Sequence, residues 1–220
     1  MSGKHLALNG FDMYTQGEPF QLVEHQTTER TGPDGAIRKS DNIVHAFRDA
    51  AGRFRIESGF IKNGVFEVRN IILFDPVALT SVTFAPHGTI ARLTQVEPRQ
   101  LPTADDERKA AEQAARSAAY DRAHPEDFSE EALGTRTIAG EQAVGTRKKQ
   151  LFVALDGVTR FPRVTEAWTS PDLKIDLLKI ADDPAIGKIT TEVTELKRTE
   201  PGPELFKVPA GLTIEVQMRH

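Results

Sequence analysis

The 220-residue sequence predicts a mainly β protein, built as a single large curved antiparallel sheet with one long interrupting helix. Clusters of Gly, Pro, Asn and Asp recur at short intervals, and these residues are the ones that form turns. The segments between them, roughly 8–15 residues long, are rich in Val, Ile, Thr and Phe, which is typical of antiparallel strands. Residues 102–132 depart from this pattern because they are rich in Ala, Glu and Arg.

The first strand-rich region covers residues 20–99 and is expected to hold six strands. Apolar and charged residues alternate in it, so each strand has a dry and a wet face, as in an antiparallel sheet covered on one side. Asn63-Gly64 suits the tight type I′ turn of a hairpin. The alternation assigns to the dry face Phe54, Ile56, Phe60, Phe66, Val68, Ile72, Phe74, Val82 and Phe84.

Residues 103–124 are expected to form the helix. Thr103 and Asp106 have the spacing of a capping box, and Pro125 is expected to end the helix. The apolar stripe of the helix is mostly alanine, and burial of one methylene-sized group contributes only about 0.8 kcal/mol. We therefore expect a helix that rests lightly over the concave face of the sheet and opens easily.

The second strand-rich region, residues 133–217, is expected to hold about six more strands. In LKIDLLKI, the residues Leu173, Ile175 and Leu177 alternate with charged ones. Large apolar residues are few in this region, so its strands need the first region as a partner surface. We therefore expect one domain over residues 1–220 rather than two.

Composition excludes or disfavours several classes of function. The net charge is −4 with both signs interspersed, whereas nucleic acids and anionic membranes attract a basic excess. No apolar run approaches the length of a transmembrane helix. The chain has no cysteine, which excludes disulfides, thiolate nucleophiles and cysteine-ligated metals. The start MSGKH is too short and polar for a signal peptide, so the protein is either cytosolic or exported after loss of a signal.

The sequence contains no catalytic, cofactor or metal motif. No metal-binding spacing occurs among the six histidines, which are His5, His25, His45, His87, His124 and His220. Two of them, His25 and His45, fall on neighbouring strands and could meet across a hairpin, where an ordinary surface pair is far more common than a metal site. The single tryptophan, Trp168, is interpreted as a core or rim residue, with lining of a ligand site as the alternative.

Four segments resemble a family of uncharacterised exported bacterial proteins. In the C-terminal half they are LGTRTIAGEQAVGTR (133–147) and the run from VTEAWTSP to ELFKVPAGLTI (164–214), and in the N-terminal half RDAAGRFRIE and ILFDPVALTSVTF. That family is similar in architecture to the lipoprotein-carrier (LolA/LolB-like) half-barrel superfamily of the bacterial periplasm. This sequence departs from the family because it lacks the usual signal and has DPVALT in place of a more glycine-rich turn.

The resemblance implies a half-barrel whose concave face holds acyl chains under helices. It also implies a periplasmic or exported location and an ordered C-terminus. In that arrangement Leu205, Phe206 and Val208 would form a short apolar plug. Pro209-Ala210-Gly211 would then turn the chain into an edge strand, residues 212–216, with its apolar side chains facing inward.

These observations favour a non-enzymatic exported protein that binds a hydrophobic ligand, such as a lipid or acyl chain, in the concave face. An envelope module that has a closed core and binds a protein through an exposed strand edge is the alternative. A hydrolase is disfavoured because no catalytic constellation is visible. No metal, cofactor or nucleic acid is expected, and any protein partner stays unknown. The predicted ligand-binding residues are Phe54, Ile56, Phe60, Phe66, Val68, Ile72, Phe74, Val82, Phe84 and Trp168.

Overall fold

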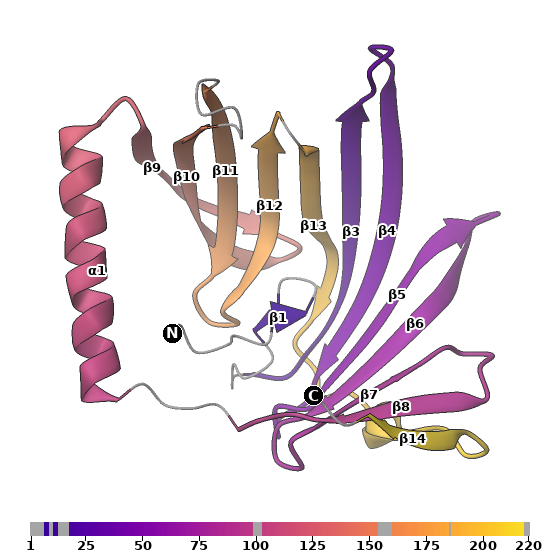
Figure 1. Ribbon diagram of the computed structural model, residues 1–220. Helices are drawn as coiled ribbons and strands as arrows, with labels where there is room; N and C mark the ends of the chain where they lie inside the picture. Colours follow the sequence, from indigo (N-terminus) through magenta and orange to yellow (C-terminus); the bar gives the residue numbers. More distant parts are fainter. Residues whose placement is uncertain are drawn as a thin grey trace.

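The structure is a computed structural model that describes residues 7–8, 11–12, 18–98, 103–153, 160–184 and 186–217. Twelve strands form one open, strongly curved sheet in the order β14-β8-β7-β6-β5-β4-β3-β13-β12-β11-β10-β9 (Figure 1). The mainly β fold with one long helix is the fold class that the sequence predicts.

The first strand-rich region supplies β3 (Phe20–Thr31), β4 (Ile37–Arg48), β5 (Phe54–Lys62), β6 (Val65–Asp75), β7 (Thr80–Phe84) and β8 (Ile90–Gln95). The second supplies β9 (Phe128–Ile138), β10 (Glu141–Val153), β11 (Arg160–Ser170), β12 (Ile175–Asp183), β13 (Gly187–Lys197) and β14 (Thr213–Gln217). A separate two-stranded sheet consists of β1 (Ala7–Leu8) and β2 (Phe11–Asp12). The two halves join where β3 pairs with β13, and every pair of neighbours is antiparallel except β14 with β8.

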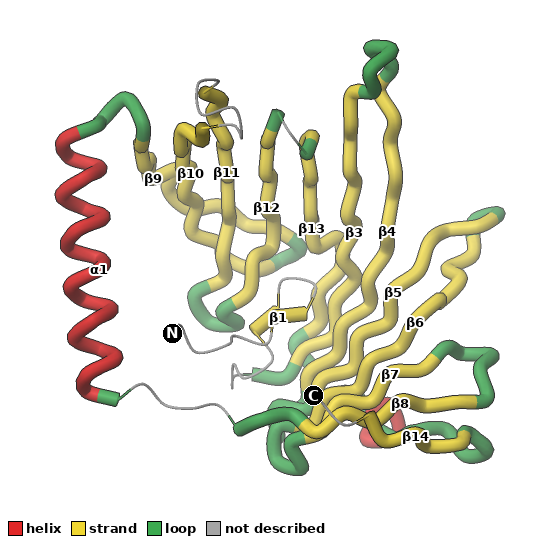
Figure 2. The backbone as a smooth tube through the Cα atoms, in the orientation of Figure 1, coloured by secondary structure: helices red, strands yellow, loops and turns green. Residues whose placement is uncertain are grey.

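The helix α1 (Ala104–Ala123) begins and ends where the sequence predicts. Thr103 and Asp106 form the reciprocal capping box, and the helix ends one residue before the capping His124, which precedes Pro125. No residue of α1 is buried. Figure 2 shows α1 standing clear of the strands, and it contributes no side chain to the core. In this structure α1 therefore does not rest on the concave face, contrary to the expectation, because an alanine stripe offers the sheet little apolar surface.

The main core lies on the concave face of the sheet. It combines residues of both halves, among them Phe20, Phe54, Phe74, Trp168, Leu173 and Leu177. Arg48 lies at the base of this core and is 0% exposed. It donates hydrogen bonds to the carbonyls of Glu18 (2.6 Å) and Leu173 (3.4 Å). Leu173 precedes β12, which lies three strands away from β4 in the sheet. Side chains of distant strands converge on the concave side of a curved sheet, so this contact identifies the face.

A β-bulge between β5 and β6 decides which residues share that face. Ile56 pairs with Ile72, but beyond a register shift at Ser58/Gly59 it is Val68 that pairs with Gly59. The extra residue reverses the alternation. Ile72 and Phe74 therefore face the core, whereas Phe66 and Val68 lie on the outer face, and the predicted alignment of all four was wrong.

A second, smaller core lies on the outer face. Val82 pairs with Leu73 and Phe84 pairs with Ile71, and these four pack together with Ala91. Val82 and Phe84 were expected on the same face as Phe54, but the pairing partners place them on the opposite one. Strand β6 is thus apolar on both faces, whereas β7 and β8 direct Ser81, Thr83, Arg92 and Thr94 to the concave face.

The C-terminal segment covers the outer core. The 3₁₀ helix η1 (Pro203–Phe206) is fixed to β5, because Arg55 donates a hydrogen bond to the Leu205 carbonyl at 2.9 Å. Val208 and Leu212 then pack against the outer core. The apolar plug therefore exists, with its residues half-buried, but it lies on the outer face.

The final strand β14 forms the predicted edge of the sheet and pairs in parallel with β8. Its apolar side chains do not face inward as expected. Ile214 is 52% exposed and Val216 is 65% exposed. They extend the outer apolar rows beyond the last covered strand, since Ile214 pairs with Ala91 and Val216 with Leu93.

The variant Arg48→Met is expected to lower the free energy of unfolding by about 3 kcal/mol, because it leaves the buried Leu173 carbonyl and the Glu18 carbonyl without their donor. Urea unfolding followed by Trp168 fluorescence measures this loss. The exposed Arg122→Met is the control and should change stability by less than about 0.5 kcal/mol. Equal stability of the Arg48 variant and the wild type would contradict the prediction.

We propose that the chain unfolds as one cooperative unit, because β3 and β13 pair and the main core uses both halves. Residues 132–220 expressed alone should show poorly dispersed amide signals and no sharp thermal transition, whereas the full chain should show a single transition. A sharp transition of the isolated fragment would indicate two domains.

Candidate functional site

The concave face is graded from apolar to polar along the strands. Cross-strand pairing places Phe20, Arg48, Phe54 and Phe74 in its lowest row. The next row contains Leu22, Ala46, Ile56 and Ile72. The third row contains Val193, Glu24, Val44, Ser58 and Asn70, so polar side chains other than Arg48 begin there.

The structure divides the predicted ligand-binding residues into three groups. Phe54, Ile56, Phe74 and Trp168 belong to the closed main core. Two half-buried residues, Phe60 and Ile72, lie on the concave face beside that core. The outer face holds Phe66, Val68, Val82 and Phe84.

Phe60 and Ile72 are therefore the predicted residues that remain partly exposed on the concave face. The guanidinium of Arg69 lies over the Phe60 ring, 4.5 Å from its centroid. Cation and ring together make a partly apolar surface that remains accessible.

Trp168 is closely surrounded by protein. Its exposed fraction is 7%, and a side-chain carbon on Gly145 would come within 2.6 Å of the ring. The guanidinium of Arg136 lies 4.1 Å from the ring centroid, and the indole N–H donates a hydrogen bond to Glu166 at 2.8 Å. This environment supports the interpretation as a core residue.

The concave face contains one buried acid that the sequence analysis missed. Glu24 is 5% exposed, and its neighbours along the row, Val44 and Val193, are buried and apolar. Burial, with a smaller contribution from the charge of Asp176, raises the pKa of Glu24 to about 7. The sequence signal was a charged residue in the apolar phase of an alternating strand, after Phe20 and Leu22.

Arg48 carries the same signal, because it follows Val44 and Ala46 in the apolar phase of β4. Burial lowers the pKa of Arg48 to about 10, so the guanidinium stays charged at neutral pH. Its guanidinium lies 4.6 Å from the Phe20 ring centroid and 5.9 Å from that of Phe54.

The histidine pair lies on the outer face, with His25 opposite Ile43 and His45 opposite Val23, two rungs apart. His25 contacts Asp41 at 3.1 Å, whereas His45 is 4.0 Å from Glu57 and stacks on Phe66. Burial lowers the pKa of His45, and the charges of Glu57 and Glu195 oppose that shift. No three His, Asp or Glu side chains of the described residues group as metal ligands. His5 and His220 lie outside the described residues.

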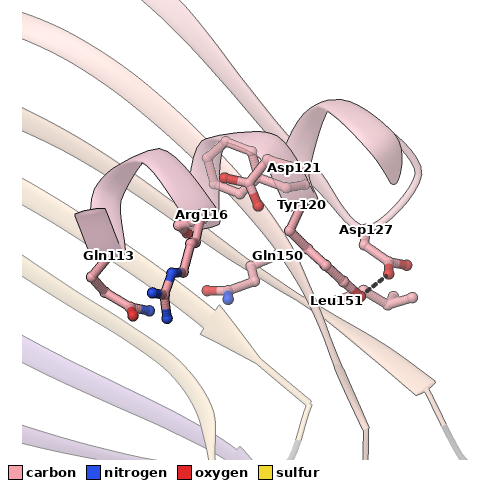
Figure 3. A pocket seen from close by; sticks show the side chains of 9 residues that line it. Gln113, Arg116, Tyr120, Asp121, Asp127, Gln150 and Leu151 are labelled. Carbon is pink, nitrogen blue, oxygen red and sulfur yellow. Dashed lines mark hydrogen bonds between the residues drawn. The ribbon is translucent and has the colours of Figure 1, made fainter. Parts of the chain in front are cut away.

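An open groove separates α1 from the ends of β9 and β10 (Figure 3). Its volume is 480 Å³, and polar helix residues such as Gln113 and Arg116 line one side. Tyr120, Phe128 and Leu151 supply its apolar part. The Tyr120 hydroxyl donates a hydrogen bond to Asp127 at 3.1 Å, which ties the end of α1 to the start of β9.

The variant Glu24→Gln is expected to make stability independent of the ionisation of this buried group. With the raised pKa, the unfolded chain loses its proton at lower pH than the folded protein, so ionisation destabilises the fold between about pH 4.5 and 7. Glu24→Gln should therefore unfold like the wild type near pH 4.5 but be more stable by up to about 3 kcal/mol at pH 8. Urea unfolding at both pH values measures the difference, and the exposed Glu192→Gln should not reproduce it.

Comparison with solved structures finds several proteins with a similar fold. MucB in its complex with MucA from Pseudomonas aeruginosa is similar with a TM-score of 0.43 and 11% identity, over 91% of this chain and 59% of that chain. A LolA superfamily protein from Nitrosomonas europaea has a TM-score of 0.37 and 10% identity, over 89% and 92% of the two chains. The lipoprotein LppX of Mycobacterium tuberculosis has a TM-score of 0.35 and 12% identity, over 80% and 85%.

The chain thus spans less than two thirds of MucB, at 59% of its length. No family model and no curated protein matches the sequence. No helix within the described ranges combines the length and apolar character needed to cross a membrane. At these identities and TM-scores the likeness concerns the fold and assigns no ligand or partner. The similar structures include a LolA superfamily protein, a member of the superfamily that the sequence analysis compares with this chain.

Proposed function

We propose that this chain is a non-enzymatic, exported or periplasmic binding protein that holds an apolar ligand, such as a lipid acyl chain, on the concave face of its sheet. The ligand would contact the half-buried Phe60 and Ile72, and α1 would act as a movable cover. The observation that carries this proposal is the absence of any buried residue along the 20 residues of α1.

A helix of this length is usually stabilised by packing of one face against the rest of the protein. In α1 the capping box and the favourable helix propensity of alanine take that role. One side-chain hydrogen bond, from Tyr120 to Asp127, links the helix to the following strand. A weakly attached helix beside an open groove can move over a ligand at little cost in existing contacts.

An interaction module with a closed core is the second candidate. The buried Phe54, Ile56 and Phe74 favour it, because these predicted ligand contacts already pack against protein. The exposed Ile214 and Val216 on the edge strand β14 would then mark the surface used.

Hydrogen exchange distinguishes the two candidates. The amides of α1 should exchange much faster than those of β6 in the free protein, and fatty-acyl compounds at tens of micromolar should slow them. Exposed strand β14 serves as the internal control and should not change with ligand.

The ligand-binding proposal fails if α1 is protected as well as β6 without ligand. It also fails if no acyl compound changes the exchange of α1. Either result would favour the interaction module.

A further inference from the structure

The carboxyl group of Glu24 has no evident structural role. Among the described residues, no donor forms a hydrogen bond or ion pair with it. The buried cation on the same face, Arg48, donates its hydrogen bonds to backbone carbonyls instead. A buried carboxyl group without a donor costs stability, which a purely structural position would avoid.

The carboxyl group remains accessible at one point. No completely buried side-chain oxygen of the described residues lacks a hydrogen-bond partner, so the small exposed part of Glu24 includes its carboxyl oxygens. A ligand atom can therefore reach them from the concave face without unfolding the core.

The surroundings of Glu24 fit the polar end of an amphiphile. Ser58 and Asn70 continue its row as half-buried polar residues, whereas Ile72 lies one row below as a half-buried apolar residue. Asp176 adds a second negative charge from β12. The Asp176 carboxylate already accepts a hydrogen bond from the Thr169 hydroxyl at 2.6 Å, and it lies 3.7 Å from the Lys179 ammonium.

We propose that Glu24 binds the ammonium group of an alkylamine-type amphiphile, whose alkyl chain lies along Ile72 and Phe60. An ammonium group supplies both the missing hydrogen-bond donors and the opposite charge. The inference rests on the proposed function, since it names the chemical class of the apolar ligand. It also explains why an acid, rather than a further apolar residue, occupies the apolar phase of β3.

The test compares three amphiphiles of equal chain length below their micelle concentrations: dodecylammonium, dodecyltrimethylammonium and dodecanoate. Isothermal titration of the wild-type protein at pH 8 should give one-to-one binding of dodecylammonium about tenfold or more tighter than dodecanoate, the ratio expected from one charge-assisted hydrogen bond. Dodecyltrimethylammonium has the charge without the N–H groups and should bind with intermediate affinity.

In Glu24→Gln the preference for dodecylammonium over dodecanoate should fall toward one, whereas the exposed Glu192→Gln should keep it. The wild type provides a second test without any substitution. Its preference should decrease when the pH is lowered from 8 to 5.5, because Glu24 becomes protonated while the amine stays charged. Asp176 is the other carboxylate nearby, so Asp176→Asn is included and should keep most of the preference.

The outcomes separate the two proposals. If no amphiphile binds, the proposed function fails. If the amphiphiles bind but dodecylammonium has no advantage, or Glu24→Gln and low pH leave that advantage intact, the function stands and the role of Glu24 is overturned.

Discussion

The burial of the Arg48 guanidinium is the constraint on which the curved sheet depends. It joins the backbone before β3 to the turn before β12 through the carbonyls of Glu18 and Leu173. Because a charged group can be buried only with its donors satisfied, these segments must stay close together. Phe20 and Phe54 flank the guanidinium from the two neighbouring strands. The contact of Arg48 with Leu173 requires the sheet to bend between β4 and β12. The concave face and its closed base follow from this arrangement.

The closed base limits what the concave face can hold. Its lowest rows are filled by side chains of both halves of the chain, so a ligand meets protein surface only above them. There the wall changes from apolar to polar within one row, at Glu24. A ligand that fits such a wall is amphiphilic and not simply a long alkyl chain. The unburied α1 is consistent with a cover that gains its packing partner only when the site is filled.

The outer face is covered in a different way. There the chain provides its own cover, because Arg55 fixes η1 and the following residues pack on the outer core. The cover ends before β14, which leaves Ile214 and Val216 in solvent. The two apolar faces of the sheet are thus covered by different parts of the protein. The concave face is closed by residues of distant strands, and the outer face by the C-terminal segment.

The sequence by itself determined the features that local physics controls. Turn residues and alternation predicted the strands, and the capping box with Pro125 predicted both ends of α1. Only the tertiary structure decided which side chains meet. Alternation fixes the faces within one regular strand, but the bulge at Ser58/Gly59 reversed them for Phe66 and Val68. The burial of Arg48 and Glu24 depends on partners far away in the sequence, because convergence of strands, and not residue type, removed these charges from water.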